Sequence, residues 1–476
     1  MKEYQFKTAG KTRIERDLLG EKEVPVEALF GIQTLRCIEN FDISRQLLSE
    51  HPQFTKALGL VKMGAIKANN ELKLVEDDVT NAIVVACQEL MDGEHSDHFP
   101  VDLVQGGAGT SVNMNANEVI ANRALEILGK NRGEYEFCHP NDHVNMAQST
   151  NDAYPTAMHL GLYMLHDELK DSLEKLIKSL ENKTIEFSDI IKMGRTQLQD
   201  AVPMTLGQSF SAYMDAMKNE LKRLNLASKE LLVINMGATA IGTGITAEPG
   251  YAELCTQHIK EISGWDIVLA ENLIEATHDT SAMVAYSSAM KMIALRLSKI
   301  CNDLRLMASG PRAGLSEIQL PAKQPGSSIM PGKVNPVIPE VVNQVCFKVI
   351  GNDLTISMAS EAAQLELNVM EPVLVQSLIE SSTWLKRAFD TLRIDCIDGI
   401  EANEEHCKSV VENSIGIVTA LKPFIGYANS TRIAQEALET GGSVYQLVLD
   451  KKLLTQEQLD KILDPKRMIR PSKVEI

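Results

Sequence analysis

Residues 324–336 contain the side chains in this sequence that are best suited to chemistry. The segment reads Gln-Pro-Gly-Ser-Ser-Ile-Met-Pro-Gly-Lys-Val-Asn-Pro, which places the hydroxyls of Ser327 and Ser328 close to Lys333 and Asn335. Its three prolines and two glycines exclude a regular helix or strand, because proline lacks a backbone donor and glycine disfavours order. We therefore predict a loop, which is either a plain solvent-exposed connection or a lid that closes over a site.

A second polar segment, residues 105–111, offers glycine amides followed by the hydroxyls of Thr110 and Ser111. Exposed backbone amides beside neutral donors can hold a carboxylate or a phosphate. No Gly-Lys-Ser or Gly-Lys-Thr follows, so the segment is not a nucleotide-binding P-loop. A tight turn between two helices explains the same residues without any ligand.

Two more segments place neutral donors next to expected helices. Ser149, Thr150 and Asn151 stand directly before a long helical pattern, where they either bind a ligand or simply cap the helix. Thr196 and Gln197 lie in a short loop before the next helical pattern. Both segments therefore supply hydroxyl and amide groups at positions where a helix begins.

His139 and His143 are four residues apart and raise the question of a metal site. Pro140 excludes a regular helix across them, and no carboxylate completes a ligand set. We therefore predict no metal-ligating residues in this sequence.

Together these segments supply many neutral donors and few carboxylate bases, a set that suits a small anionic substrate. The chain has 47 basic and 64 acidic residues and a formal net charge of −17, so an anion would be attracted only by a local positive group. Lys333 is the obvious candidate for that group. The same acidity, with no block of Lys and Arg, argues against a nucleic-acid partner. The side-chain types alone do not identify the reaction.

The sequence also argues against several other classes of protein. The first residues have no apolar signal core, and no run of about 18 apolar residues occurs, so we expect a cytoplasmic protein with no membrane span. The eight cysteines are far apart and form no Cys-x-x-Cys pair, which disfavours a disulfide framework and a zinc site. We expect these cysteines to be buried thiols.

The spacing of apolar residues predicts a mainly helical, all-α fold. Intervals of three and four residues indicate about five long amphipathic helices in the middle of the chain. The segments are 165–180, 206–224, 283–304, 341–349 and 374–392.

A chain of 476 residues is longer than one hydrophobic core usually supports, so we expect several domains. We predict a mainly helical N-terminal domain over residues 1–149 and a central long-helix bundle over 150–405 that carries the loop at 324–336. A small helical C-terminal domain follows over 406–476.

The long helices also predict self-association. Residues 283–304 form a heptad-like apolar stripe, and helices this apolar cannot all be satisfied inside one five-helix bundle. We therefore expect a homotetramer in which the helices of four chains pool into one multi-helix core.

Residues 326–336, Gly-Ser-Ser-Ile-Met-Pro-Gly-Lys-Val-Asn-Pro, resemble the signature of the aspartase/fumarase superfamily, whose members eliminate a group beta to a carboxylate and release fumarate. Within that superfamily, the chain is most similar to the members that eliminate ammonia from L-aspartate. Gln197 stands where class II fumarases carry a histidine, and Thr246 departs from the pattern, in which asparagine is common. The resemblance covers nearly the whole chain, and its other motifs are residues 13–17, 31–34, 106–110, 145–152, 195–200, 335–340 and 425–427.

The resemblance implies a reversible elimination of ammonia from L-aspartate to give fumarate. Ser327 would act as an oxyanion base on the beta carbon, and the product of that step would be an aci-carboxylate. A weak base of this kind needs a closed, preorganised site. The substrate-binding residues that the resemblance implies are Thr110, Ser111, Ser149, Thr150, Asn151, Thr196, Gln197, Ser328, Met330, Lys333 and Asn335.

The resemblance implies no required cofactor and leaves activation by a divalent cation open. It implies L-aspartate and fumarate as small-molecule partners, and a homotetramer whose active sites combine residues from different subunits. Two alternatives remain. One is a class II fumarate hydratase, against which Gln197 argues, and the other is a crystallin-like structural protein of the same fold, against which the intact Ser327, Lys333 and Asn335 argue.

Overall fold

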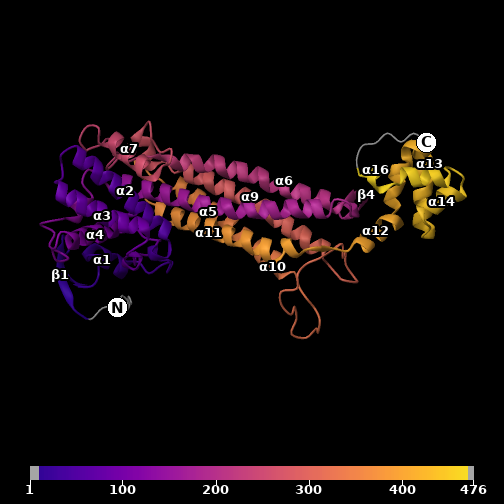
Figure 1. Ribbon diagram of the computed structural model, residues 1–476, viewed down its shortest axis with the longest axis horizontal. Coiled ribbons are helices and arrows are strands. Elements are labelled where there is room, and N and C mark those ends of the chain that lie inside the picture. Colours follow the sequence, from indigo (N-terminus) through magenta and orange to yellow (C-terminus); the bar gives the residue numbers. More distant parts are fainter. Residues whose placement is uncertain (1–9, 470–476) are drawn as a thin grey trace. The chain divides into compact units, whose positions relative to one another are not determined.

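The computed structural model describes residues 10–469 of the chain. Helices dominate these residues, and the described strands form only two-stranded sheets (Figure 1). The predicted mainly helical fold class is therefore confirmed. None of the described helices is long and apolar enough to cross a membrane. All eight cysteines are free and buried, as predicted, and burial raises the pKa of every one of these thiols.

The chain divides into two compact units, each built from three stretches of sequence. Unit 1 comprises Met1–Asp171, Lys222–Met292 and Phe347–Leu385. Unit 2 comprises Ser172–Leu221, Ile293–Cys346 and Lys386–Ile476. The division into three domains stays a prediction.

Unit 1 begins with a hairpin and a group of helices. In the hairpin, Asp17 pairs with Gly20 across a two-residue turn. The buried carboxylate of Glu118 accepts the N–H groups of Gly31 and Thr34 at 2.8 and 3.1 Å, which satisfies amides at the start of α1. The elements are β1 (Thr12–Asp17), β2 (Gly20–Pro25), α1 (Ile32–Asn40), α2 (Pro52–Glu71), α3 (Asp77–Asp92) and α4 (Thr110–Ile127).

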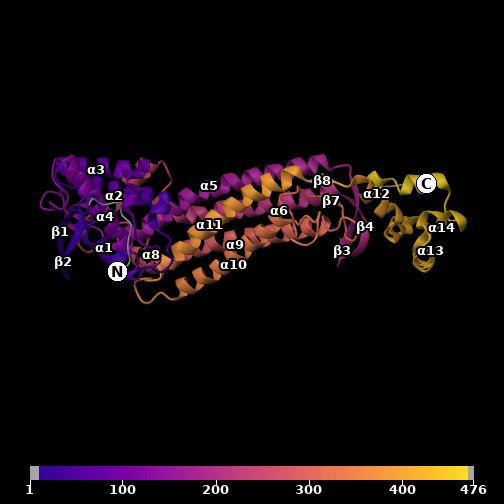
Figure 2. The ribbon, with the colours of Figure 1, turned by 90° about the horizontal axis from the view of Figure 1, so that it is seen from below.

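Five long helices contribute segments to both units, in the regions where the apolar spacing predicts them. They are α5 (Thr150–Glu186), α6 (Leu206–Ala227), α9 (Ser281–Met307), α10 (Val337–Glu361) and α11 (Glu371–Asp395). Within each unit, segments of these helices lie side by side (Figure 1 and Figure 2). In unit 1 the Tyr286 ring of α9 meets the His166 ring of α5, with centroids 5.9 Å apart. In unit 2 Asn343 of α10 donates to Ser298 Oγ of α9 at 2.9 Å.

The heptad-like stripe of α9 is covered within the single chain. Its residues Met283, Tyr286, Met290, Ile293, Leu297, Ile300 and Leu304 are each no more than 2% exposed. The expectation that helices this apolar cannot all be satisfied within one chain is therefore wrong for this stripe, because neighbouring helices of the same chain already bury it. Among the long helices, α10 carries three large apolar side chains that stay uncovered, because Phe347, Leu354 and Met358 are 61–65% exposed.

Unit 2 contains a hairpin that the sequence did not predict. β3 (Ile191–Thr196) and β4 (Gln199–Thr205) pair in antiparallel fashion directly before α6, where we expected a plain loop. Met193 of β3 belongs to a buried apolar cluster with Leu421, Ile433 and Val448 of the C-terminal helices. These helices are α12 (Glu404–Asn413), α13 (Val418–Thr440), α14 (Val444–Asp450), α15 (Gln456–Ile462) and α16 (Pro465–Met468).

The remaining strands contain two residues each, and two further α-helices accompany them in unit 1. In unit 1 they are β5 (Val233–Ile234) and β6 (Val268–Leu269), which pair in parallel, with α7 (Tyr251–Ser263) and α8 (Leu273–His278). In unit 2 they are the antiparallel pair β7 (Ile318–Gln319) and β8 (Glu401–Ala402).

Candidate active site

The first predicted polar segment forms a tight turn into α4. Gly107, Ala108 and Gly109 all have positive φ (95, 56 and 88°), and a Cβ on Gly109 would lie 2.5 Å from the ring of Tyr154. Glycine is therefore required where α4 approaches α5. Thr110 is the first residue of α4, and its Oγ1 donates to the Gly107 carbonyl at 2.7 Å. The start of this 18-residue helix favours an anion, because its first amides have no intrahelical partner.

The second segment caps α5. Ser149 Oγ accepts the N–H of Asn151 at 3.2 Å, and Asp152 Oδ1 accepts the N–H of Ser149 at 2.9 Å. This reciprocal pattern satisfies two amides at the start of the helix. The capping alternative is thus realised in the fold, and the role of Ser149 in substrate binding stays a prediction.

The starts of α4 and α5 are joined by one side chain. Asn113, one turn after Thr110, donates from Nδ2 to Thr150 Oγ1 at 3.2 Å. Five candidate residues of unit 1 are thereby brought to the same pair of helix starts: Thr110, Ser111, Ser149, Thr150 and Asn151.

Lys62 lies beneath this junction, and the sequence reasoning missed it. Its ammonium group is fully buried and donates to Asn113 Oδ1 at 2.7 Å, Asn145 Oδ1 at 3.0 Å and Gln148 Oε1 at 2.8 Å. Burial lowers the pKa of Lys62 to about 7, while the nearby carboxylate of Asp152 opposes the shift. The signal in the sequence was a lysine four residues from Leu58 and from Ile66 on the apolar face of α2.

The glycine- and threonine-rich run at 236–244 packs against the start of α5. Asn151 Nδ2 donates to the Ala240 carbonyl at 2.7 Å. Asp152 Oδ2 accepts the N–H groups of Gly237 and Thr239 at 3.1 and 2.9 Å. Burial nevertheless raises the pKa of Asp152 to about 6, and these N–H groups oppose that shift.

Thr196 and Gln197 lie at the turn of the β3–β4 hairpin in unit 2. Gln197 and Leu198 have φ values of 54 and 62°, the left-handed conformation that a two-residue hairpin turn requires. The preceding Arg195 donates to Glu317 Oε1 at 2.5 Å, and Lys192 lies 2.7 Å from Glu317 Oε2. Glu317 is 1% exposed, so a buried carboxylate fixes the base of this hairpin.

The predicted loop at 324–336 is irregular (Figure 1). Hydrogen bonds among Gly326, Lys333 and Asn335 close its base, which we call the neck. The N–H of Gly326 donates to the Lys333 carbonyl at 2.7 Å, and Asn335 Nδ2 donates to the Gly326 carbonyl at 2.8 Å. Ser327 Oγ accepts the N–H groups of Ile329 and Met330 at 3.2 and 3.0 Å. Two backbone dipoles therefore point at the oxygen of Ser327.

The remaining candidates of the loop are open to solvent. Ser328, Met330 and Lys333 are exposed, and Asn335 is half-buried. The structure thus gathers five candidates at the helix starts of unit 1. It places seven in unit 2: Thr196, Gln197, Ser327, Ser328, Met330, Lys333 and Asn335.

The histidine pair at 139 and 143 takes part in a local turn. His143 Nδ1 accepts the N–H of His139 at 2.8 Å, and His139 Nδ1 accepts the N–H of Asn141 at 3.1 Å. These bonds close a short π-helical turn, Pro140–Val144. The Nδ1 atoms of both rings thus serve the backbone rather than a common ligand.

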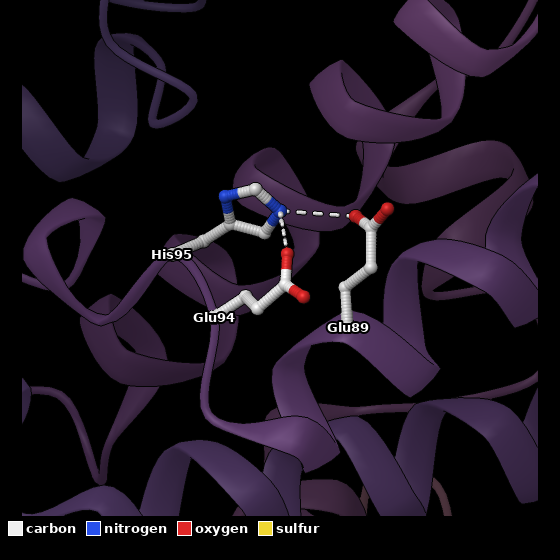
Figure 3. Close-up of side chains that lie close together, drawn as sticks. All are labelled: Glu89, Glu94 and His95. Atoms are coloured by element: carbon white, nitrogen blue, oxygen red, sulfur yellow. Dashed lines mark hydrogen bonds and ion pairs between the residues drawn. The ribbon is translucent and has the colours of Figure 1, made fainter.

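A second cluster consists of residue types that bind metal ions, but an arginine side chain is paired with it. Figure 3 shows Glu89, Glu94 and His95, whose ligand atoms lie within 4.8 Å of one another. Arg123 donates to both oxygens of Glu89, at 2.6 and 2.8 Å. Because a cation would be repelled by this guanidinium group, the cluster is better described as an ion-pair network.

Comparison with known proteins decides the family. The family model described as "Lyase" matches residues 20–351, and one described as "Fumarase C C-terminus" matches residues 417–470. The chain belongs to the lyase family. The expected resemblance to the aspartase/fumarase superfamily is therefore confirmed.

Members of this lyase family resemble the chain over nearly its full length. An aspartate ammonia-lyase of Pseudomonas aeruginosa is 56% identical over 97% of this chain and 97% of its own. One of Escherichia coli is 53% identical over 97% of this chain and 96% of its own. The crystal structure of a fumarate lyase:delta crystallin from Brucella melitensis bound to cobalt is 51% identical, covers 97% of this chain and 100% of its own, and has a TM-score of 0.95. These likenesses confirm the predicted enzyme class, a carbon–nitrogen lyase.

Proposed function

We propose that this lyase eliminates ammonia from L-aspartate in a reversible reaction and releases fumarate. The observation that carries the proposal is the environment of Ser327, whose Oγ accepts two backbone N–H groups. Hydrogen bonds to the charged form of a group lower its pKa, so these amides favour the serine oxyanion. A serine activated in this way can remove a proton from the beta carbon.

Removal of that proton places a second negative charge on the neighbouring carboxylate, which becomes an aci-carboxylate. We assign it to neutral donors, namely the hydroxyls of Thr110, Ser149 and Thr150 and the backbone of Ser328. The start of α4 at Thr110 supports this assignment, because helix N-termini stabilise anions. The oxyanion-hole principle requires such donors to be in place before the charge develops.

The other carboxylate is assigned to Lys333, Asn335 and Thr196. Lys333 is exposed, so its ammonium group is available for a substrate carboxylate. Asn151 and Gln197 are assigned to the departing amino group, with Ser111 and Met330 completing the pocket. A neutral amide at Gln197 suits an amino group that leaves with its own protons.

We further propose that the active site combines residues of different subunits in a homotetramer. The support within the described residues is the exposed apolar side chains of α10, because Phe347, Leu354 and Met358 are 61–65% exposed. Large exposed apolar patches mark association surfaces. Closed symmetry would let the α10 helices of several copies cover one another.

The substrate is tested by following fumarate absorbance with L-aspartate and then with L-malate as sole substrate. Fumarate release from L-aspartate, and none from L-malate, is the expected result. Release from L-malate alone would replace the proposal with a fumarate hydratase, which is the nearest enzymatic alternative and against which Gln197 argues. No release from either substrate would favour the crystallin-like structural alternative.

The composite site is tested with two inactive variants, Thr150→Ala and Ser327→Ala. After the two are dissociated and reassociated together, some mixed sites contain only unmutated segments, so partial activity returns. Each variant taken alone through the same treatment is the control. Mixed oligomers with no more activity than these controls would refute a shared site.

A further inference from the structure

A cavity of about 240 Å³ in unit 1 lies beside the start of α5 and is used by none of the proposed catalytic groups. Residues of α5, α8, α9 and α11 contribute to its walls. Its ionisable lining residues are His159, Glu230, Glu275, Asp279 and Glu371. Neither lysine nor arginine is among the lining residues, so the cavity has an excess of negative charge.

Glu371 provides this cavity with a buried carboxyl group. It is the first residue of α11, it is only 3% exposed, and it lines the cavity. Within the described part of the chain, no hydrogen bond or ion pair reaches its carboxylate. Buried carboxylates normally have such partners, because an isolated buried charge is unfavourable. Burial accordingly raises the pKa of Glu371 to about 8.

His159 adds a second acceptor. Its Nδ1 lies 3.1 Å from the Val233 carbonyl oxygen, and a carbonyl can only accept, so Nδ1 carries the proton. The Nε2 atom of the neutral ring is then free to accept a hydrogen bond. Burial lowers the pKa of His159, which favours this neutral form.

The spacing of these groups distinguishes between kinds of cation. In the portion of the chain that is described, the only group of three His, Cys, Asp or Glu ligand atoms within 4.8 Å of one another is the Glu89 cluster. The acidic residues and the histidine that line the cavity therefore form no preformed set of three ligands for a divalent cation such as Ca²⁺, which contacts oxygen at roughly 2.3–2.6 Å. Hydrogen bonds from a cationic N–H group span about 2.7–2.9 Å and tolerate acceptors that are farther apart.

We propose that this cavity binds a small cation that carries N–H donors, either ammonium or a primary alkylammonium ion. Glu371 is the buried counter-ion, His159 Nε2 accepts a second hydrogen bond, and Glu230 and Glu275 at the rim attract the cation. The site is separate from the proposed catalytic groups, and its occupancy does not depend on which substrate the enzyme uses.

The cavity is nevertheless linked to the start of α5. Asn235 lines the cavity, and its side chain donates to the Asn151 carbonyl at 3.1 Å and accepts from Thr156 Oγ1 at 3.2 Å. An occupant of the cavity would therefore stabilise the segment from which Asn151 projects.

The test is titration calorimetry and thermal unfolding of the full-length protein at about pH 8, in ammonium chloride up to roughly 0.2 M. Potassium chloride and tetramethylammonium chloride at equal ionic strength are the references, because neither cation has N–H donors. Ammonium is expected to bind and to raise the unfolding temperature above both references. Methylammonium chloride is tested in the same way to distinguish ammonium from a primary alkylammonium ion. If methylammonium binds and raises the unfolding temperature as much as ammonium does, an R–NH₃⁺ group is sufficient.

The neutral variant Glu371→Gln should weaken ammonium binding by about tenfold or more, since a charge-assisted hydrogen bond is lost. Glu361→Gln, an exposed carboxylate at the end of α10, is the matched control and should bind as the unmodified chain does. If Glu371→Gln does not fold, the double variant Glu230→Gln/Glu275→Gln removes rim charge without altering a buried group. This variant is expected to bind ammonium several-fold more weakly.

Three results would overturn the proposal. The first is an equal response to potassium and ammonium, the second is an ammonium response that survives both Glu371→Gln and the double variant, and the third is stabilisation by magnesium chloride alone.

Discussion

The guanidinium group of Arg195 donates to the carboxylate of Glu317 at 2.5 Å, and Glu317 holds Lys192 through its other oxygen. One buried acid thus pairs with two cations of β3, just before the turn that presents Thr196 and Gln197. We expect Glu317→Gln to reduce the free energy of unfolding by about 3–5 kcal/mol, because two partly buried cations lose their counter-ion.

Urea unfolding followed by circular dichroism measures this effect. Glu174→Gln, an exposed carboxylate of α5 in the same unit, is the control and should change the free energy of unfolding little. Equal stability of the two variants would mean that Glu317 does not anchor the hairpin.

Ser327→Ala should leave the fold and the oligomer intact while lowering the rate of fumarate release from L-aspartate by at least about a hundredfold, the contribution of a positioned base. The variant removes only the oxygen that accepts the Ile329 and Met330 amides. Ser357→Ala, a serine of α10 far from the loop in sequence, is the control. Near-normal turnover in a correctly assembled Ser327→Ala enzyme would exclude Ser327 as the base.

Lys333→Met should raise the Michaelis constant for L-aspartate, since a carboxylate loses a charge-assisted partner that contributes about 1.5–3 kcal/mol. Lys323→Met is a matched control from the same connection, because the ammonium group of Lys323 is already paired with Asp395 at 2.8 Å. Steady-state kinetics of both variants is the measurement, and the Michaelis constant is expected to rise in Lys333→Met but not in Lys323→Met. Unchanged kinetics in Lys333→Met would show that this lysine is only a solvated surface residue.

Thr246→Asn should stabilise the chain. Ala247 donates its N–H to the Gly244 carbonyl at 3.1 Å, and Thr246, the third residue of this turn, has a φ of 71°. Such a position favours glycine or asparagine, whereas a β-branched side chain there is strained by about 1 kcal/mol. Thr243→Asn is the control, and differential scanning calorimetry is the measurement. A lower unfolding temperature for Thr246→Asn would contradict this account of the turn.

Glu371 should make stability depend on pH. Its pKa is raised from 4.5 to about 8 in the fold, so the unfolded chain loses this proton first as the pH rises. The stability of the unmodified chain therefore falls relative to Glu371→Gln between about pH 4.5 and pH 8, and the difference is complete above pH 8. The other charged groups of the cavity, His159, Glu230, Glu275 and Asp279, are common to both chains and cancel.

Urea unfolding of both chains at about pH 5 and pH 8.5 measures the difference, without ammonium and then with it. Ammonium should reduce the difference in free energy of unfolding between the two chains at the higher pH, because it supplies a counter-ion for the Glu371 carboxylate. A difference that does not change with pH would mean that Glu371 ionises with an ordinary pKa.

The long helices were predictable because their apolar residues repeat with the helical period and are buried together, as in α9. Their environment was not predictable, because the period shows which face is apolar but does not identify what covers it. The stripe of α9 is covered by its own chain, whereas Phe347 and Leu354 of α10 are not.

The hairpin at Thr196 and Gln197 was not predictable for a different reason. Two-residue hairpin turns are usually recognised in a sequence by Asn-Gly or Asp-Gly. Here Gln197 and Leu198 adopt positive φ values although neither pair is present. The same holds for Lys62, since a buried lysine is rare enough that sequence reasoning assigns it to the surface. The candidate site residues at helix starts were recognisable because the polar types that bind anions also cap helices.

Under the proposed assignment, the neck of the 324–336 loop connects Lys333, which binds a substrate carboxylate, to Ser327, which removes the proton. The carbonyl of Lys333 is bonded to Gly326, the residue directly before Ser327, and Asn335 is bonded to the same glycine from the other side. A carboxylate that binds the ammonium group of Lys333 and displaces this residue would therefore also displace Ser327, because the two residues are connected through Gly326. Under the proposed assignment, a molecule without the matching carboxylate would leave the base unaligned, so discrimination between substrates would arise partly from motion within a single loop.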